Sequence, residues 1–325
     1  MSSRLQKTID NFNNRIESGA FYEAHQTLRT IVNRYVKSKK YPEAIDLLYH
    51  GALTLASNQE YASASDLISY LLEVYNEADI KCTNEGREKE YKIKIIEALI
   101  KLVDSEPSLP DLSKKTISWS KEGNKSVFGD SDFHHIFGLK FLNKVQEQDI
   151  SLTEEERSNL FSYAETHLIL GNSETLPHYI NFLYRWYEEA PENCDPGLFV
   201  GRAVINYAYL KNIHFARDSL DKFMKKLIDS KKQHRIIQEN NAEVFEFSGF
   251  DSTLLTFLQL LIITLTKEDA GNKFLNLYNH FKSTLAHYDL SAPIEYLGRL
   301  YFNLNIGRPQ GGQNMFANLV GDLFK

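Results

Sequence analysis

Three copies of one short pattern recur at intervals of twenty residues near the start of the chain. Each copy is an aromatic residue, two spacers and an alanine, at Phe21–Ala24, Tyr41–Ala44 and Tyr61–Ala64. A large and a small residue three positions apart share one helix face, where the alanine lets a neighbouring helix approach closely. Two such units make a helical hairpin of about forty residues, in the range of the stacked-helix repeats. The pattern therefore predicts an all-α fold, an α-solenoid of stacked antiparallel helical hairpins of the TPR or HEAT kind, which typically holds partners.

The composition agrees with long helices and narrows the class of protein. The 325 residues include only 8 prolines and 16 glycines, and the net charge of −6 argues against general nucleic-acid binding. Cys82 and Cys194 lie far apart and are expected to be reduced thiols. The N-terminus has no apolar signal segment, and the most apolar stretch, 254–265, is too short to span a bilayer. We therefore expect a cytoplasmic protein that does not itself insert into a membrane.

Helices are expected along nearly the whole chain. Leu5, Ile9, Phe12 and Ile16 form the apolar stripe of the first helix, which Gly19 ends. Later helices are expected near 20–37, 41–56, 59–77, 84–103, 112–121, 132–147, 153–170, 174–189, 196–211, 213–230, 251–266, 268–287 and 292–303. The polar stretch 149–155 leads into a capping-box pattern, so we place a domain boundary there. The expected regions are 1–150 and 151–306, followed by a flexible C-terminal tail, 307–325.

Two segments of the C-terminal part of the chain lack the pattern typical of an ordinary helix. The segment 234–247 has two β-prone runs around an Asn-Asn pair, which favours a β-hairpin over a disordered loop. A lone hairpin is marginal in water, so this one is a candidate partner contact. The tail begins with a glycine-rich link, after which Phe316, Leu319 and Leu323 follow a helical rhythm. That stretch could fold back on its domain, fray or hold a partner.

Charge reverses sign between the first two blocks of forty residues. Residues 1–40 contain eight Lys or Arg and three acids, whereas residues 41–80 contain seven acids and neither Lys nor Arg. These could be two solvated faces that attract each other across the stack, an effect worth little when exposed. They could also form a docking surface whose paired fields orient a partner. The absence of any basic side chain over forty residues favours the partner slightly.

No motif in the sequence points to catalysis. The chain lacks the zinc-protease, P-loop, nucleophile-elbow and dinucleotide-binding patterns. Ten histidines are scattered, and neither His134-His135 nor His167 with His178 has a further ligand at metal-binding spacing. We therefore expect no enzyme, no metal and no cofactor.

Four segments resemble a known family, the fourth subunit of the Golgi-to-ER traffic machinery, which serves the guided entry of tail-anchored proteins. They are Phe21–Lys37, Asp66–Tyr75, Phe257–Thr264 and Ile294–Phe302. The resemblance implies an all-helical, non-catalytic adaptor. Such an adaptor bridges a ubiquitin-like-domain partner, held by the C-terminal half, to a targeting ATPase docked on the N-terminal helices.

The resemblance also assigns roles to particular residues. Phe21 and Lys37 match the ATPase-anchoring positions, which in the family are commonly tyrosine and arginine, so this anchor is expected to be weaker. Asp66 and Glu73 match an acidic pair that regulates the docked ATPase, and the basic stripe at Lys7 and Arg15 matches a further contact surface.

The same resemblance places the ubiquitin-like partner against the hairpin. The candidate contacts there are Ile237, Val244, Phe245 and Phe247. The alternative interpretation is a helical-repeat scaffold subunit of another assembly, such as a lid or a coat. A small ubiquitin-like subunit that co-purifies in equal amount is expected only for the adaptor.

Overall fold

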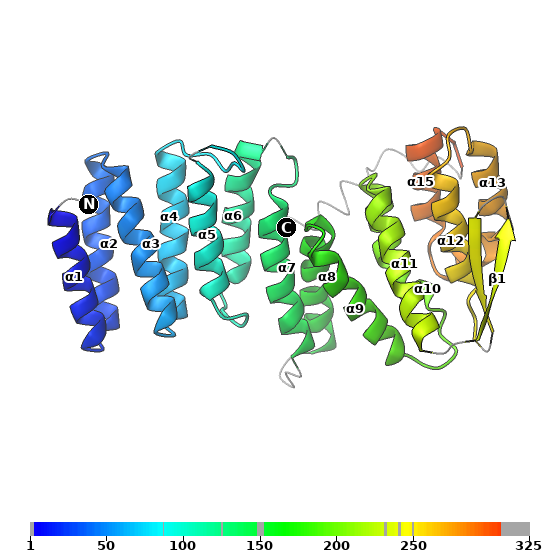
Figure 1. Cartoon of the computed structure of the whole chain (residues 1–325), viewed down its shortest axis with the longest axis horizontal. Coiled ribbons are helices and arrows are strands. Elements are labelled where there is room, and N and C mark those ends of the chain that lie inside the picture. The colour runs from blue at the N-terminus through cyan, green and yellow to red at the C-terminus, as the bar shows by residue number, and fades with distance from the viewer. Residues whose placement is uncertain are drawn as a thin grey trace. The chain divides into compact units, whose positions relative to one another are not determined.

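The computed structural model describes residues 3–86, 88–124, 126–147, 153–230, 233–239, 242–248 and 250–306. Within these ranges the chain forms fifteen helices and one two-stranded antiparallel sheet, as the all-α solenoid prediction with one β-hairpin requires (Figure 1). The chain divides into two compact units, Met1–Asn172 and Ser173–Lys325. The functional division at residue 150 stays a prediction, and the expected tail, 307–325, lies outside the described residues.

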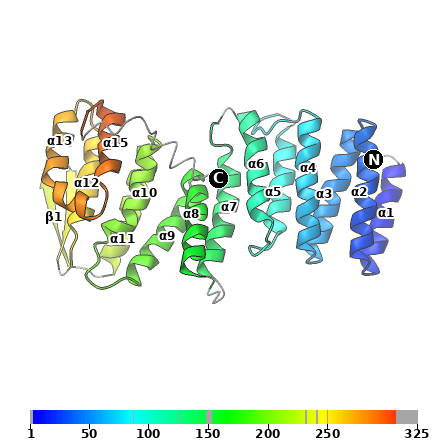
Figure 2. The ribbon, with the colours of Figure 1, turned by 180° about the vertical axis from the view of Figure 1, so that it is seen from behind.

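Unit 1 consists of helices that run back and forth beside one another (Figures 1 and 2). They are α1 (Ser3–Glu17), α2 (Phe21–Lys37), α3 (Tyr41–Ser57), α4 (Tyr61–Glu77), α5 (Lys89–Lys101), α6 (Leu109–Asn124), α7 (Ser131–Gln146) and α8 (Glu154–Leu170). The helices α1 to α5 pack consecutively, as do α6, α7 and α8, and alternate helices also touch: α2 contacts α4, α4 contacts α6, and α1 contacts α3. The row α2–α4–α6 is therefore a continuous layer of unit 1.

The twenty-residue interval has a backbone origin. Gly19, Lys39, Gln59 and Asp79 each adopt a left-handed conformation, with φ of 75°, 56°, 65° and 56°. After each of them, the next N–H donates back five positions to a carbonyl of the helix just ended, as from Lys40 to Tyr35 at 2.9 Å. This is the Schellman closure of a helix C-terminus. The same joint therefore turns the chain after each of the first four helices.

Small residues let these helices approach, as the repeat predicts. Ala24, Ala44 and Ala64 are each no more than 1% exposed. A Cβ added at Gly51 would lie 2.9 Å from methyl groups of both Leu28 and Leu67. Helix α3 thus packs between α2 and α4 at a distance that a larger residue would disturb.

Unit 2 places a hairpin against helices. Its elements are α9 (Thr175–Glu188), α10 (Gly197–Tyr209), α11 (Ile213–Asp229), β1 (His234–Glu239), β2 (Ala242–Phe247), α12 (Thr253–Leu265), α13 (Gly271–His280), α14 (Lys282–His287) and α15 (Ser291–Phe302). Helix α10 contacts α9, α11, α12 and α15 and so lies at the centre of the unit. The prediction of a single helix over 268–287 is wrong in two respects. Helix α13 begins only at Gly271, and α13 and α14 are separated at Phe281, whose ring packs 5.4 Å from that of Phe257.

The β-hairpin is confirmed, with both strands where the sequence predicts them. Its register pairs Ile237 with Val244 and Ile236 with Phe245, and β2 contacts α12. Successive strand residues point to opposite faces, so Ile236 and Phe245 share one face and Ile237 and Val244 the other. The predicted Asn-Asn turn, 240–241, lies outside the described residues.

Candidate docking surfaces

Helix α4 presents two acidic side chains of unit 1 on one face. Asp66 and Glu73 are seven residues apart, two turns or about 10 Å along the helix. His25 Nε2 of α2 donates to the Asp66 carboxylate at 2.8 Å, and Arg29 of α2 forms an ion pair with the same carboxylate. The hydrogen bond from His25 is the main cause that lowers the pKa of Asp66, with Arg29 adding to it. Asp66 is therefore a charged carboxylate held by α2.

Glu73 is held from the other side of α4. Lys115 Nζ of α6 lies 3.0 Å from the Glu73 carboxylate and also donates to the Ser69 hydroxyl. Between the two acids, the Tyr70 ring lies 5.2 Å below the guanidinium of Arg29. The α2–α4–α6 layer thus carries two acids of α4 flanked by a base of α2 and a base of α6. We call this set the charged ridge: Arg29, Asp66, Tyr70, Glu73 and Lys115.

The two predicted anchor residues lie at opposite ends of α2. Phe21 is the first residue of the helix and Lys37 the last, so about 24 Å separates them along the axis. Lys37 is exposed, but Phe21 is only half-exposed and packs against the core of unit 1. Its neighbour Tyr22 is 71% exposed and offers the freer aromatic surface. The sequence analysis did not single out Tyr22, because the repeat pattern marks the inward-facing position before it, Phe21.

The basic stripe of α1 meets α2 at one point. Arg15 donates to the Thr27 hydroxyl at 3.0 Å, while Lys7 is exposed just over two turns, or about 12 Å, away towards the other end of α1. Because α1 and α2 are antiparallel neighbours, Arg15 lies beside the Phe21 end of α2 and Lys7 towards the Lys37 end. The predicted residues thus spread over α1, α2 and α4 instead of converging on a pocket.

In unit 2, a glutamine fixes the hairpin to a helix. The side chain of Gln259 on α12 accepts from the Phe245 N–H at 2.8 Å and donates to the Phe245 carbonyl at 2.9 Å. It therefore pairs with the outer edge of β2 much as another strand would. This places the hairpin as a wall beside α12.

The predicted hairpin contacts separate into two groups. Val244 and Phe247 are 7% and 5% exposed, so they hold the hairpin to the unit and offer little surface to a partner. Ile237 is 42% exposed, and Phe245 is partly exposed. Ile236, which sequence reasoning passed over, is 50% exposed and shares the face of Phe245. Strict alternation along the strand is the signal that pairs these two side chains.

A groove of about 560 Å³ runs between α11, α12 and β2. Its apolar walls are Leu220, Met224 and Ile228 of α11, Phe245 of β2, and Ile262 and Ile263 of α12. Arg217, Lys225 and Lys267 line it together with Asp221 and Glu243, so both signs of charge are present. The spacing i, i+4, i+8 of the α11 residues is a stripe visible in the sequence. We call this feature the C-terminal groove.

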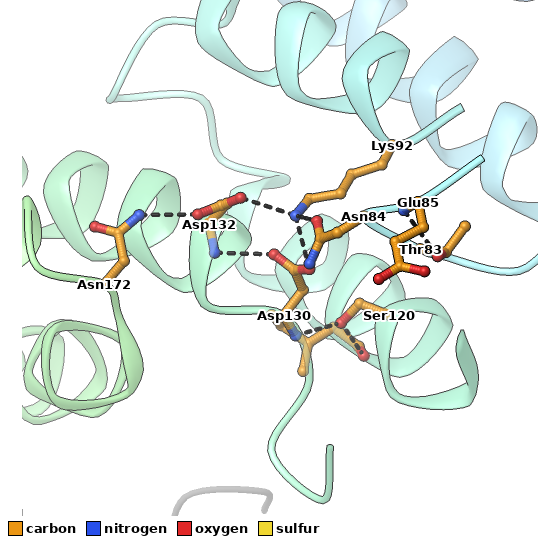
Figure 3. Close-up of polar contacts among 9 residues, drawn as sticks. Thr83, Asn84, Glu85, Lys92, Ser120, Asp130, Asp132 and Asn172 are labelled. Atoms are coloured by element: carbon orange, nitrogen blue, oxygen red, sulfur yellow. Dashed lines mark hydrogen bonds and ion pairs between the residues drawn. The ribbon is translucent and has the colours of Figure 1, made fainter. Parts of the chain in front are cut away.

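Buried polar groups of unit 1 stabilise the fold. Lys92 of α5 lies between Asp130 and Asp132 at the start of α7, with Nζ 2.8 Å from a carboxylate oxygen of each, and it also reaches Asn84 (Figure 3). Asn172 donates to the second oxygen of Asp132 at 2.9 Å. This ion cluster joins α5 and the start of α7 to two loops, those of Asn84 and Asn172.

The histidines do not assemble a metal site. His134 and His167 form a buried pair with their Nδ1 atoms 2.9 Å apart, and His134 Nε2 donates to the Phe128 carbonyl at 2.8 Å. Across the part of the chain that the structure describes, no group of three or more His, Cys, Asp or Glu side chains could hold a metal ion. In the same part, no helix has the length and apolarity needed to cross a bilayer.

Comparison with known proteins gives one consistent result. A family model described as Golgi to ER traffic protein 4 matches residues 38–324. Golgi to ER traffic protein 4 of Schizosaccharomyces pombe is 30% identical over 310 residues, which cover 93% of this chain and 90% of that protein. The Aspergillus fumigatus protein of the same name is 30% identical over 335 residues, covering 99% and 90%. The crystal structure of C. therm. Get4 superposes with a TM-score of 0.80 at 23% identity, covering 99% of this chain and 96% of that one, and so has the same fold.

Proposed function

Because the chain belongs to the Golgi to ER traffic protein 4 family and so has a role in Golgi-to-ER traffic, we propose that it is a non-catalytic cytoplasmic adaptor. In this role it bridges a ubiquitin-like-domain partner to the ATPase that delivers tail-anchored proteins to the ER membrane, and it regulates that ATPase. The family resemblance inferred from the four sequence segments is confirmed. The partners and their positions are our proposal.

The charged ridge is the observation that carries the proposal for the ATPase. It is at least partly exposed, extends over three helices and presents the acids of α4 between a base of α2 and a base of α6, which suits an interface that steers and orients one partner. The anchors Phe21 and Lys37 would bind at the two ends of α2, and Lys7 and Arg15 would extend the contact along α1. Asp66 and Glu73 would act on the docked ATPase from the middle of this surface.

Neutral variants of the two acids test this assignment. Asp66→Asn and Glu73→Gln together keep side-chain size but remove both charges from the ridge. We expect them to change the ATPase turnover or the nucleotide-dependent binding, while circular dichroism reports an unchanged helix content. Glu60→Gln, which removes an acid at the start of α4, serves as the control. Unchanged binding and turnover in the double variant would exclude the regulatory role.

The C-terminal groove supports the second half of the proposal. Grooves between helices with apolar walls and a charged rim suit an amphipathic segment of a partner. The proposed contact with the ubiquitin-like partner would therefore use Phe245 and the α11 wall, with Ile236 and Ile237 on the exposed part of the hairpin. Val244 and Phe247 would contribute by holding the hairpin in place.

A groove variant separates this contact from the ATPase contact. Ile263 is only partly buried at the groove wall, so Ile263→Glu should place a charge there without unfolding α12. We expect it to release the ubiquitin-like partner while the ATPase still binds, as judged by co-purification of each. Thr256→Glu, on α12 but outside the groove lining, is the matched control. Retention of both partners by Ile263→Glu would show that the groove is not the contact.

A further inference from the structure

The acids of the charged ridge are already neutralised within the chain, and not equally. Asp66 has two partners on α2, one of which is the imidazole of His25, buried between the helices at 8% exposure. Arg29, the other, is further fixed over the Tyr70 ring at 5.2 Å. Within the described part of the chain, the cation paired with Glu73 is Lys115, at 3.0 Å, and both side chains of this pair are about half exposed, at 58% and 47%. The pair at Glu73 is thus the more exchangeable of the two.

The exposure of the Glu73–Lys115 pair determines how easily another cation can replace the lysine. An ion pair in water between two long, half-exposed side chains is worth little, because the charges are screened and ordering the side chains costs entropy. Another cation that approaches Glu73 with better geometry, such as a guanidinium, can therefore displace the lysine at small cost. At Asp66 the same exchange would have to displace both the packed imidazole of His25 and the stacked guanidinium of Arg29 from the carboxylate.

We propose that Lys115 is an internal competitor for the basic group with which a partner contacts Glu73, so that this lysine limits the affinity of the charged ridge for the ATPase. This inference rests on the proposed function of the ridge. Lys115 bridges Ser69 and Glu73, which lie four residues apart on α4, and so occupies the position from which a cation on the partner would reach the carboxylate. Asp66 keeps its internal partners and fixes α2 against α4, whereas Glu73 exchanges partners on docking.

The chain offers a closely matched control for the test. Lys114 is the neighbour of Lys115 on α6, is also exposed, and pairs with Asp111 at 3.8 Å instead of with α4. Lys114→Gln and Lys115→Gln remove the same charge from the same turn, so their long-range effect on a basic partner is nearly equal. Only Lys115→Gln frees the Glu73 carboxylate.

The experiment measures the affinity of full-length wild type, Lys114→Gln and Lys115→Gln for the ATPase at moderate salt. We expect Lys115→Gln to bind about two to five times more tightly than Lys114→Gln, the range that a surface ion pair supplies. The gain should disappear when both lysine variants are compared in a Glu73→Gln background. These two results together support the competitor role.

Other outcomes overturn it. Equal affinities of the two lysine variants would mean that only the overall field matters, and weaker binding of Lys115→Gln would mean that Lys115 itself contacts the ATPase. A gain that persists in the Glu73→Gln background would also exclude competition for that carboxylate. If the wild type does not bind the ATPase, the proposed function fails as well. Binding by the wild type with no difference between the lysine variants removes this inference alone.

Discussion

Single buried ionisable residues set much of the behaviour expected of unit 1. The His134–His167 pair is neutral because burial lowers the pKa of His134 to about 4 and that of His167 well below its usual range. Since His134 Nε2 carries the proton donated to Phe128, its Nδ1 accepts from the Nδ1–H of His167. Acidification has to break this arrangement, because a second proton would put an N–H against an N–H.

Stability is therefore expected to fall on mild acidification. In the unfolded chain a histidine has a pKa near 6.5, so between about pH 6.5 and 4 the unfolded state binds more protons than the folded state. The free energy of unfolding should drop through this window as the pH falls, by about 2 to 3 kcal/mol for His134. Urea unfolding at pH 7 and pH 5 measures the drop.

The variant that removes both histidines provides the reference. In His134→Gln/His167→Leu, the free energy of unfolding should fall less between pH 7 and pH 5 than in the wild type. Asp195 of unit 2, whose pKa burial raises to about 6, acts in the opposite direction but titrates alike in both proteins, so it cancels in the difference. Identical pH profiles would mean that the pair does not control acid stability.

Lys92 is a second residue on which unit 1 depends. Lys92→Met keeps a chain of similar length but leaves the buried Asp130 carboxylate without its ammonium partner. We expect a loss of about 3 to 5 kcal/mol in the free energy of unfolding. Lys81→Met, which breaks two exposed ion pairs, should cost far less. A loss for Lys92→Met no greater than for Lys81→Met would show that the ion cluster is not a stabilising element.

At the scale of elements, the hairpin depends on a single side chain of α12. Gln259→Leu preserves volume but removes both bonds to the Phe245 backbone. The Phe245 amide should then exchange its hydrogen about ten to a hundred times faster, as expected for the loss of 1 to 3 kcal/mol. Gln238→Leu removes a bond to the side chain of the exposed Glu243 and should leave the exchange of the Phe245 amide unchanged. Hydrogen exchange followed by NMR distinguishes the two.

The sequence predicts the helices and strands better than the contacts between them. Ala24, Ala44 and Ala64 and the β-prone runs of 234–247 carry local signals, and both the stacked helices and the hairpin follow from them. The left-handed Gln59 has no such signal, because glycine and, less strongly, asparagine and aspartate are the residues that indicate that conformation in a sequence. The splitting of 268–287 at Phe281 likewise follows from contact with α12, which local periodicity does not contain.

The cross-helix contacts were predictable in principle from the repeat itself. Arg29 and Asp66 are 37 residues apart, His25 and Asp66 41, and Glu73 and Lys115 42. Two helices and two joints span about forty residues, so opposite charges at that separation fall beside each other in one layer. The C-terminal groove was harder to predict from the sequence, because it forms only where the hairpin, α11 and α12 come together in space.

At the scale of the whole molecule, the two docking surfaces differ in chemistry and should respond differently to salt. Raising the salt from 0.1 M to 1 M shortens the screening length from about 10 Å to about 3 Å. We expect binding of the ATPase to weaken several-fold, while binding of the ubiquitin-like partner at the largely apolar groove wall changes little. Titration of each partner against the full chain at several salt concentrations tests this. Equal salt dependence for both would contradict the assignment of the two surfaces.

The repeated left-handed joints make part of unit 1 a cassette. Residues 40–79 start directly after one such joint and end with another, at Lys39 and Asp79. A second copy spliced in after Asp79 would begin and end at left-handed joints like the present ones, and its first helix would pack against α4 where α3 now packs against α2. The length of the chain's first unit can therefore be altered in steps of two helices. Duplication of the gene segment that encodes residues 40–79 would lengthen unit 1 without a change in any turn.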